Sequence, residues 1–217
     1  TDSLNLWGDY GIYSLGPNGD SIPPYNNANF WNDWSRFSRM QYFNEQRNEL
    51  GYELLDLKIH GGGTRAYPQK SFRLNFRSRY SGHLNWDFLT QKPDIFSFNN
   101  INIRNGGGYY GKFDRIRDGV ISRLTKRTYV HNMGYEPCVL YLNGKFWGQY
   151  ALREKIDEHY VESNFDVSSE SIDMVSALNG VVCGSDDFLY SIYHEIMNND
   201  PNSENFYDLI NNKINLN

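Results

Sequence analysis

The strongest constraint on the fold is the alternation of apolar and polar residues in several short segments. In residues 52–60, Leu55, Leu57 and Ile59 alternate with charged or polar residues, and residues 71–77 and 100–104 repeat this pattern. A period of two predicts β-strands with one apolar and one polar face. Residues 38–44 and 137–143 also favour strands, and Asn143-Gly144 predicts a hairpin turn after which the chain returns over 145–152.

Helices are predicted in three other segments. In residues 116–127 the apolar side chains recur at helical spacing, and residues 153–165 and 186–210 are also expected to be helical, with an interruption at Asp200-Pro201. The sequence therefore predicts an α+β fold: a mostly antiparallel sheet with flanking helices. We expect one domain over residues 1–217.

Charge and composition exclude several classes of protein. The net charge is -5, from 21 basic and 26 acidic residues, whereas a nucleic-acid binder is usually basic. No apolar run reaches the 18 residues expected of a membrane span. With two cysteines there is no disulfide framework, and a free thiol at Cys138 is favoured over a bridge to Cys183. Five scattered histidines give no metal-binding spacing, so no metal site is predicted.

The first segment with a chemical signature is residues 60–73, which read HGGGTRAYPQKSFR. Glycines let the backbone approach a polyanion, and a following strand can direct Arg65, Lys70 and Arg73 toward it. Phosphate groups are bound by such amides, ammonium groups and guanidinium groups. Neither a Walker motif nor a dinucleotide-binding glycine motif is present. The alternative is a hairpin with solvated basic residues.

Two further segments combine glycines with charged residues. Arg104 begins the string RNGGG at 104–108, and Arg115, Arg117 and Asp118 follow it; the alternative here is a solvated helix face. Residues 143–158 read NGKFWGQYALREKIDE, in which Arg153 and Glu154 open a predicted helix. A charged pair there could organise a phosphate clamp, or it could be a surface ion pair at a helix start.

Together these strings resemble the spore-coat CotH kinase family. The resemblance rests on residues 60–73, on 104–107 with Arg117-Asp118, and on 142–157, in the same order and spacing, and it extends from about Tyr10 to the end. It implies an atypical protein-kinase-like fold that uses ATP with Mg²⁺ or Mn²⁺ to phosphorylate protein serines. It also implies a secreted or extracellular protein of the spore or cell surface, with a protein substrate or partners in an extracellular complex such as a cellulosome.

The resemblance places six residues on the nucleotide side: Arg65, Lys70, Arg73, Arg104, Arg153 and Glu154. In the family the catalytic and metal-binding aspartates follow the third string, and we expect them beyond Asn217, so that the chain is an incomplete domain that is inactive alone. The alternative function is a non-catalytic extracellular module. The 17 Tyr, 13 Phe and 5 Trp residues would then stack on polysaccharide, or the chain would bind protein partners alone.

Overall fold

The computed structural model describes residues 1–106, 115–126, 128–177 and 180–214. The chain divides into two compact units, residues 1–155 and residues 156–217. No helix in the described ranges is long and apolar enough to cross a membrane.

The first unit is built on a six-stranded antiparallel sheet with the order β1-β2-β3-β6-β8-β7. Its strands are β1 (Arg36–Phe43), β2 (Glu49–His60), β3 (Ser71–Asn75), β6 (Asn100–Arg104), β7 (Tyr135–Leu142) and β8 (Lys145–Arg153). A separate short pair is formed by β4 (Leu84–Asn85) and β5 (Ser97–Phe98). The predicted α+β class with an antiparallel sheet is therefore confirmed.

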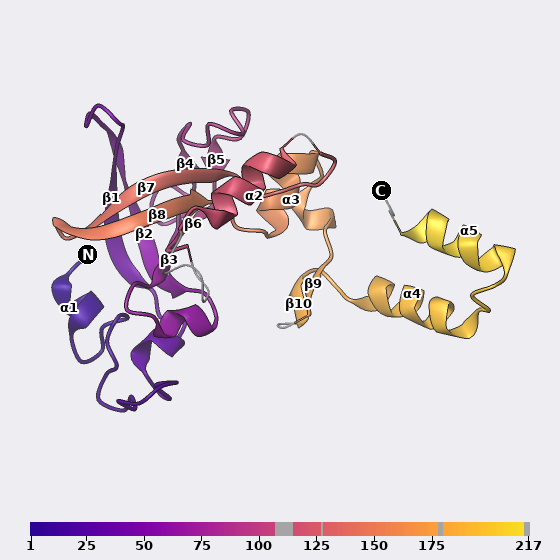
Figure 1. The fold of residues 1–217 in the computed structure, drawn as a ribbon, viewed down its shortest axis with the longest axis horizontal. Helices are drawn as coiled ribbons and strands as arrows, with labels where there is room; N and C mark the ends of the chain where they lie inside the picture. The colour runs from indigo at the N-terminus through magenta and orange to yellow at the C-terminus, as the bar shows by residue number, and fades with distance from the viewer. Residues whose placement is uncertain (107–114, 127, 178–179, 215–217) are drawn as a thin grey trace. The chain divides into compact units, whose positions relative to one another are not determined.

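The sheet is strongly twisted, because the β7–β8 hairpin runs across the direction of β1 and β2 (Figure 1). The turn that closes this hairpin is the predicted one. Asn143 and Gly144 both have positive φ, 50° and 80°, which is the conformation that favours Asn-Gly in two-residue hairpins.

One face of the sheet forms the hydrophobic core. The alternating apolar residues of β2, β3 and β6 are buried there, and Phe72 is 0% exposed. The N-terminal segment supplies Leu6 from α1 (Ser3–Trp7), Ile12, and Phe30 from the 3-10 helix η1 (Asn29–Trp31) to the same core. Each fully buried side chain of this kind stabilises the fold by about 1.5–3 kcal/mol. The opposite face keeps the polar residues of the alternation.

The helix α2 (Arg117–Thr125) lies within the predicted range but presents an unexpected side to the sheet. The apolar residues whose spacing predicted it are exposed: Ile116, Val120, Ile121 and Leu124. Its buried residues are Gly119 and Ser122. The reason is that its polar side meets charged residues at the ends of β6 and β8.

The second unit contains α3 (Glu158–Phe165), η4 (Ser169–Ser171), the hairpin β9 (Met174–Ser176) and β10 (Gly180–Cys183), α4 (Asp187–Asn198) and α5 (Glu204–Lys213). The last two helices match the predicted interrupted helix. The predicted start of the preceding helix at Arg153 is wrong. Arg153 ends β8 in pairing with β6 and β7, and the helix begins after Asp157, whose side chain caps it by accepting from the Tyr160 N–H.

Candidate functional site

Basic residues from neighbouring strands are aligned across the polar face of the sheet. Lys58 of β2 is the register partner of Arg73 of β3, Arg73 is the partner of Asn102 of β6, and Asn102 is the partner of Arg153 of β8. Residues directly opposite each other in a sheet share a face. This alignment, here called the cationic row, is held together where the Arg73 Nε donates to the Asn102 Oδ1 at 3.2 Å.

Cations gather most closely around His60, two residues along β2 from Lys58. An Arg73 Nη2 lies 2.9 Å from the His60 Nδ1, and because a guanidinium can only donate, Nδ1 is the acceptor and the ring proton is on Nε2. Burial, and then the charges of Arg73, Arg104, Arg65 and Lys58, lower the pKa of His60 from 6.5 to about 3. The imidazole is therefore neutral at physiological pH, and the four basic side chains around it define the cationic cluster.

Two carboxylates partly neutralise this face. Asp33 accepts from Arg65 at 2.9 Å and lies 3.5 Å from the Lys58 ammonium; the hydrogen bond from Arg65 holds its pKa below the usual range. Asp118, in the first turn of α2, lies 3.7 Å from an Arg104 nitrogen and 3.1 Å from an Arg153 nitrogen. The four cations around His60, together with Arg153, outnumber these two carboxylates, which suits a polyanion.

The same two carboxylates do not fit a metal site. Each is engaged by two cations, which compete with a metal ion for its oxygens. Among the described residues, no group of three or more His, Cys, Asp or Glu side chains is arranged to hold a metal ion. Guanidinium and ammonium groups do fit phosphate oxygens. This part of the chain therefore suits the phosphates of a nucleotide better than the metal ion that would accompany them.

Arg153 is the buried end of the row. Its side chain is 5% exposed, its Nε donates to the Gly134 carbonyl at 3.0 Å, and its Nη2 reaches the Ser122 hydroxyl at 3.4 Å. Together with Asp118, these partners use all three guanidinium nitrogens. Arg153 therefore ties α2 to the sheet, while the side chains of the cationic cluster are partly exposed.

Lys70 lies on the other face of the sheet from Arg73. Their positions differ by three, an odd number, and Lys70 immediately precedes β3, so alternation along the chain sends the two side chains to opposite sides. The Lys70 ammonium sits 3.9 Å from the ring centre of Phe30, a core residue, and donates to the carbonyls of Arg65 and Tyr67 at 2.6 and 3.0 Å. The expected placement of Lys70 beside Arg73 is therefore not what the structure contains.

The first glycine segment lies at the edge of the cationic cluster. Gly61 has a φ of +116°, a conformation that favours glycine. A side chain built at Gly62 or Gly63 would meet no atom within 4 Å, so the backbone there is uncovered. Arg65 binds this segment through its Nε, which donates to the Gly61 carbonyl at 2.5 Å. Of the second glycine segment, Gly107 and Gly108 lie outside the described residues.

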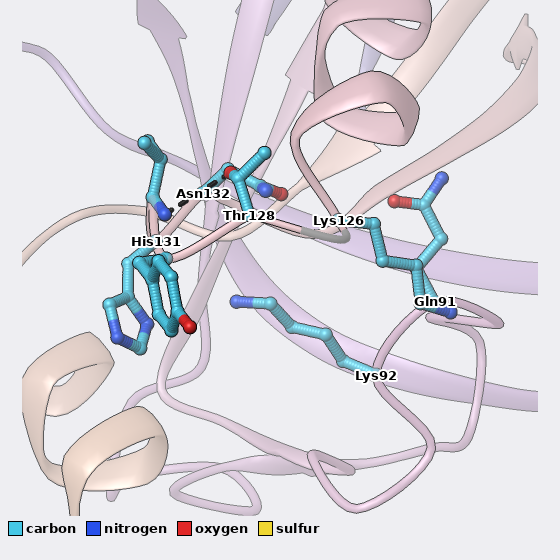
Figure 2. A pocket seen from close by; sticks show the side chains of 8 residues that line it. Gln91, Lys92, Lys126, Thr128, His131 and Asn132 are labelled. Atoms are coloured by element: carbon cyan, nitrogen blue, oxygen red, sulfur yellow. Dashed lines mark hydrogen bonds between the residues drawn. The ribbon is translucent and has the colours of Figure 1, made fainter.

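Glu154 belongs to a different group of residues. Its carboxylate accepts from the Lys92 ammonium at 2.7 Å and from the Gly134 N–H at 2.6 Å. Lys92 also lines a hollow of about 350 Å³, together with Gln91 and residues of the loop after α2. Figure 2 shows the Lys92 side chain extending across this hollow toward that loop. The hollow thus adjoins the Lys92–Glu154 pair.

The structure brings three of the six predicted site residues together: Arg65, Arg73 and Arg104. It places Arg153 at the buried end of the same row, and Lys70 and Glu154 elsewhere. Whether any of them binds a nucleotide stays a prediction. Sequence reasoning missed Lys58 and His60, although the alternation in residues 52–60 already put them on the polar face.

Comparison with known protein families gives a match that contains all three strings of glycines and charged residues. Residues 57–216 match the family described as CotH kinase protein. The chain belongs to the CotH kinase family. The match begins at Leu57, immediately before the first residue of the cationic row, and includes every member of that row. A search of curated proteins found no match.

Proposed function

We propose that the first unit of this CotH-family chain binds the phosphates of ATP at the cationic cluster, as the nucleotide side of a CotH-type kinase. The observation that carries the proposal is the cationic cluster, in which basic side chains of β2, β3, β6 and η2 are gathered around a neutral His60. In a kinase, such groups hold the phosphates in place while the γ-phosphoryl group moves from ATP to a protein hydroxyl.

The exposed groups of the site favour attachment of ATP through its phosphates over attachment through its adenine base. Arg73, Arg104 and Lys58 are partly exposed, so solvent reaches part of each side chain. The uncovered backbone of Gly62 and Gly63 leaves room for a bulky anion. A kinase-like arrangement, protein serine as acceptor, and secretion to the spore or cell surface follow from the family resemblance and are proposed on that ground.

We expect Arg73→Gln to weaken ATP binding about tenfold, because the variant removes a charged donor to phosphate and leaves the row without its central cation. Binding to the intact chain is measured by calorimetry with ATP, ADP, AMP, tripolyphosphate and adenosine, at two salt concentrations. Affinity should fall with the number of phosphates, and adenosine should not bind.

Arg39→Gln is the matched control. Arg39 lies on β1, is exposed, and stacks over the Tyr52 ring at 4.1 Å, outside the cluster. Its loss should leave ATP affinity unchanged. Adenosine binding as tightly as ATP, or an unaltered affinity in Arg73→Gln, would exclude a phosphate site at this face. A chain that binds no nucleotide but is retained on polysaccharide would support the extracellular-module alternative.

A further inference from the structure

Lys70 is the most deeply buried cation of the first unit for which no carboxylate partner is found among the described residues. Its side chain is 3% exposed, and its ammonium is held by two backbone carbonyls and by the faces of Phe30 and Tyr13, at 3.9 and 5.1 Å from the ring centres. Burying an ammonium group without a counter-ion is costly. The contacts that offset this cost therefore indicate what the charge is used for.

Both carbonyls belong to the segment that follows the glycines. One is the carbonyl of Arg65, in the 3-10 turn η2 (Gly63–Ala66), and the other is that of Tyr67, which ends the turn. The turn itself is closed by the Arg65 N–H to the Gly62 carbonyl and the Tyr67 N–H to the Thr64 carbonyl. The Lys70 ammonium therefore holds the turn from the core side of the sheet.

The side chain of Arg65 extends from this turn to the polar side. Its guanidinium donates to the carbonyls of Gly61 and Trp31 and to Asp33, and it is one of the charges acting on His60. One residue thus joins the two sides: its carbonyl is bound by Lys70, and its guanidinium forms the edge of the cationic cluster.

The backbone of Lys70 is fixed as well. Its N–H donates to the Tyr13 hydroxyl at 2.9 Å, and its carbonyl accepts from the Tyr150 hydroxyl at 2.9 Å. The Tyr13 hydroxyl in turn donates to the Pro68 carbonyl at 2.6 Å. The ammonium is therefore anchored to the core at its own backbone and can transmit that rigidity to the turn.

We propose that Lys70 is a positioning residue for the nucleotide site, which holds the glycine turn from behind and thereby fixes Arg65 at the edge of the cationic cluster. The inference rests on the proposed phosphate site, and it assigns to Lys70 no contact with the nucleotide. Arg65 is the residue through which Lys70 acts.

The test is a double-mutant cycle with Lys70→Met and Arg65→Gln, measured on the intact chain. Methionine keeps the length of the side chain and its packing against Phe30 but removes the donors. We expect about a fivefold loss of ATP affinity in Lys70→Met, a loss at least as large in Arg65→Gln, and no further loss in the double variant, because residues that act through one another are not additive. Lys145→Met, at the exposed start of β8, is the control. Losses that multiply in the double variant would overturn the inference.

A second measurement tests, without nucleotide, whether Lys70 holds the turn. In Lys70→Met, the amides of Arg65 and Tyr67 should exchange with solvent roughly tenfold faster, since the carbonyls of the turn lose a charged donor. Amides of the β7–β8 hairpin should not change. Unchanged exchange at Arg65 and Tyr67 would overturn the inference. If the wild-type chain binds no ATP, the proposed function fails, whereas this result still decides the role of Lys70.

Should Lys70→Met not fold, the wild-type chain serves instead. Burial lowers the pKa of Lys70 to about 8. The titratable side chains in contact with it, Tyr13 and Tyr150, have pKa values raised by burial, so of these three groups Lys70 is the first to lose its proton as the pH rises. Exchange of the Arg65 and Tyr67 amides should then accelerate above pH 8 relative to the β7–β8 amides. If the ratio of these exchange rates stays constant with pH, Lys70 does not hold the turn.

Discussion

Replacing Arg153 by methionine is expected to destabilise the first unit by about 3–5 kcal/mol, the usual cost of removing one partner from a buried ionic group. The variant leaves the Gly134 carbonyl and the Ser122 hydroxyl without their Arg153 donor, and of the two cations that the described residues bring to Asp118 it leaves Arg104, at 3.7 Å. The guanidinium also lies 5.5 Å from the Tyr135 ring centre, a contact that methionine replaces only in part.

Tryptophan fluorescence in a denaturant titration measures this effect cleanly. All five tryptophans lie in residues 1–155, so the signal reports the unfolding of the first unit. Arg123→Met is the control, because Arg123 is an exposed residue of α2, the helix that Arg153 contacts, and its loss should cost less than about 0.5 kcal/mol. Equal stability of the two variants would mean that the bonds of Arg153 do not hold α2 to the sheet.

Acid should destabilise the first unit well above the pH at which carboxylates titrate. The pKa of His60 is about 3 in the folded chain and 6.5 without the fold. Between these values the unfolded chain binds more protons than the folded one, so stability falls as the pH falls. From pH 6.5 to about pH 4.5 the loss from His60 alone is about 2 kcal/mol.

His60→Asn isolates this contribution, because its amide oxygen can still accept from Arg73 but does not titrate. We expect the free energy of unfolding of this variant to vary much less between pH 6.5 and about pH 4.5. The exposed His83 provides the comparison, and His83→Asn should keep the wild-type dependence. If His60→Asn loses stability with acid as steeply as the wild type, the cluster does not exclude a proton from His60.

The resemblance to the CotH family was readable from the three glycine and basic strings, and the family match agrees with it. The strands were also predictable, because alternation in residues 52–60, 71–77 and 100–104 needs one buried and one polar face. Even the separation of Lys70 from Arg73 was contained in the sequence, since their odd spacing assigns them to opposite faces. Because Lys70 and Arg73 are both basic, they were predicted to bind the same phosphate despite this odd spacing.

The start of α3 was mispredicted for a comparable reason. The charges at 153–157 suit a helix, but pairing of Arg153 with both neighbouring strands extends β8, and Asp157 caps the helix that follows. Propensity is a weak preference that strand pairing overrides. The polar side of α2 likewise became its buried side, because Asp118 on that side pairs with Arg104 and Arg153 at the ends of β6 and β8.

The sequence by itself determined the family, the strands of the six-stranded sheet, and which residues of each strand share a face. The tertiary structure decided which residues of different strands lie opposite one another. The register that aligns Lys58, Arg73, Asn102 and Arg153 depends on how four strands distant in sequence hydrogen-bond. Local periodicity specifies the faces of a strand but not its partners, because pairing is a long-range interaction.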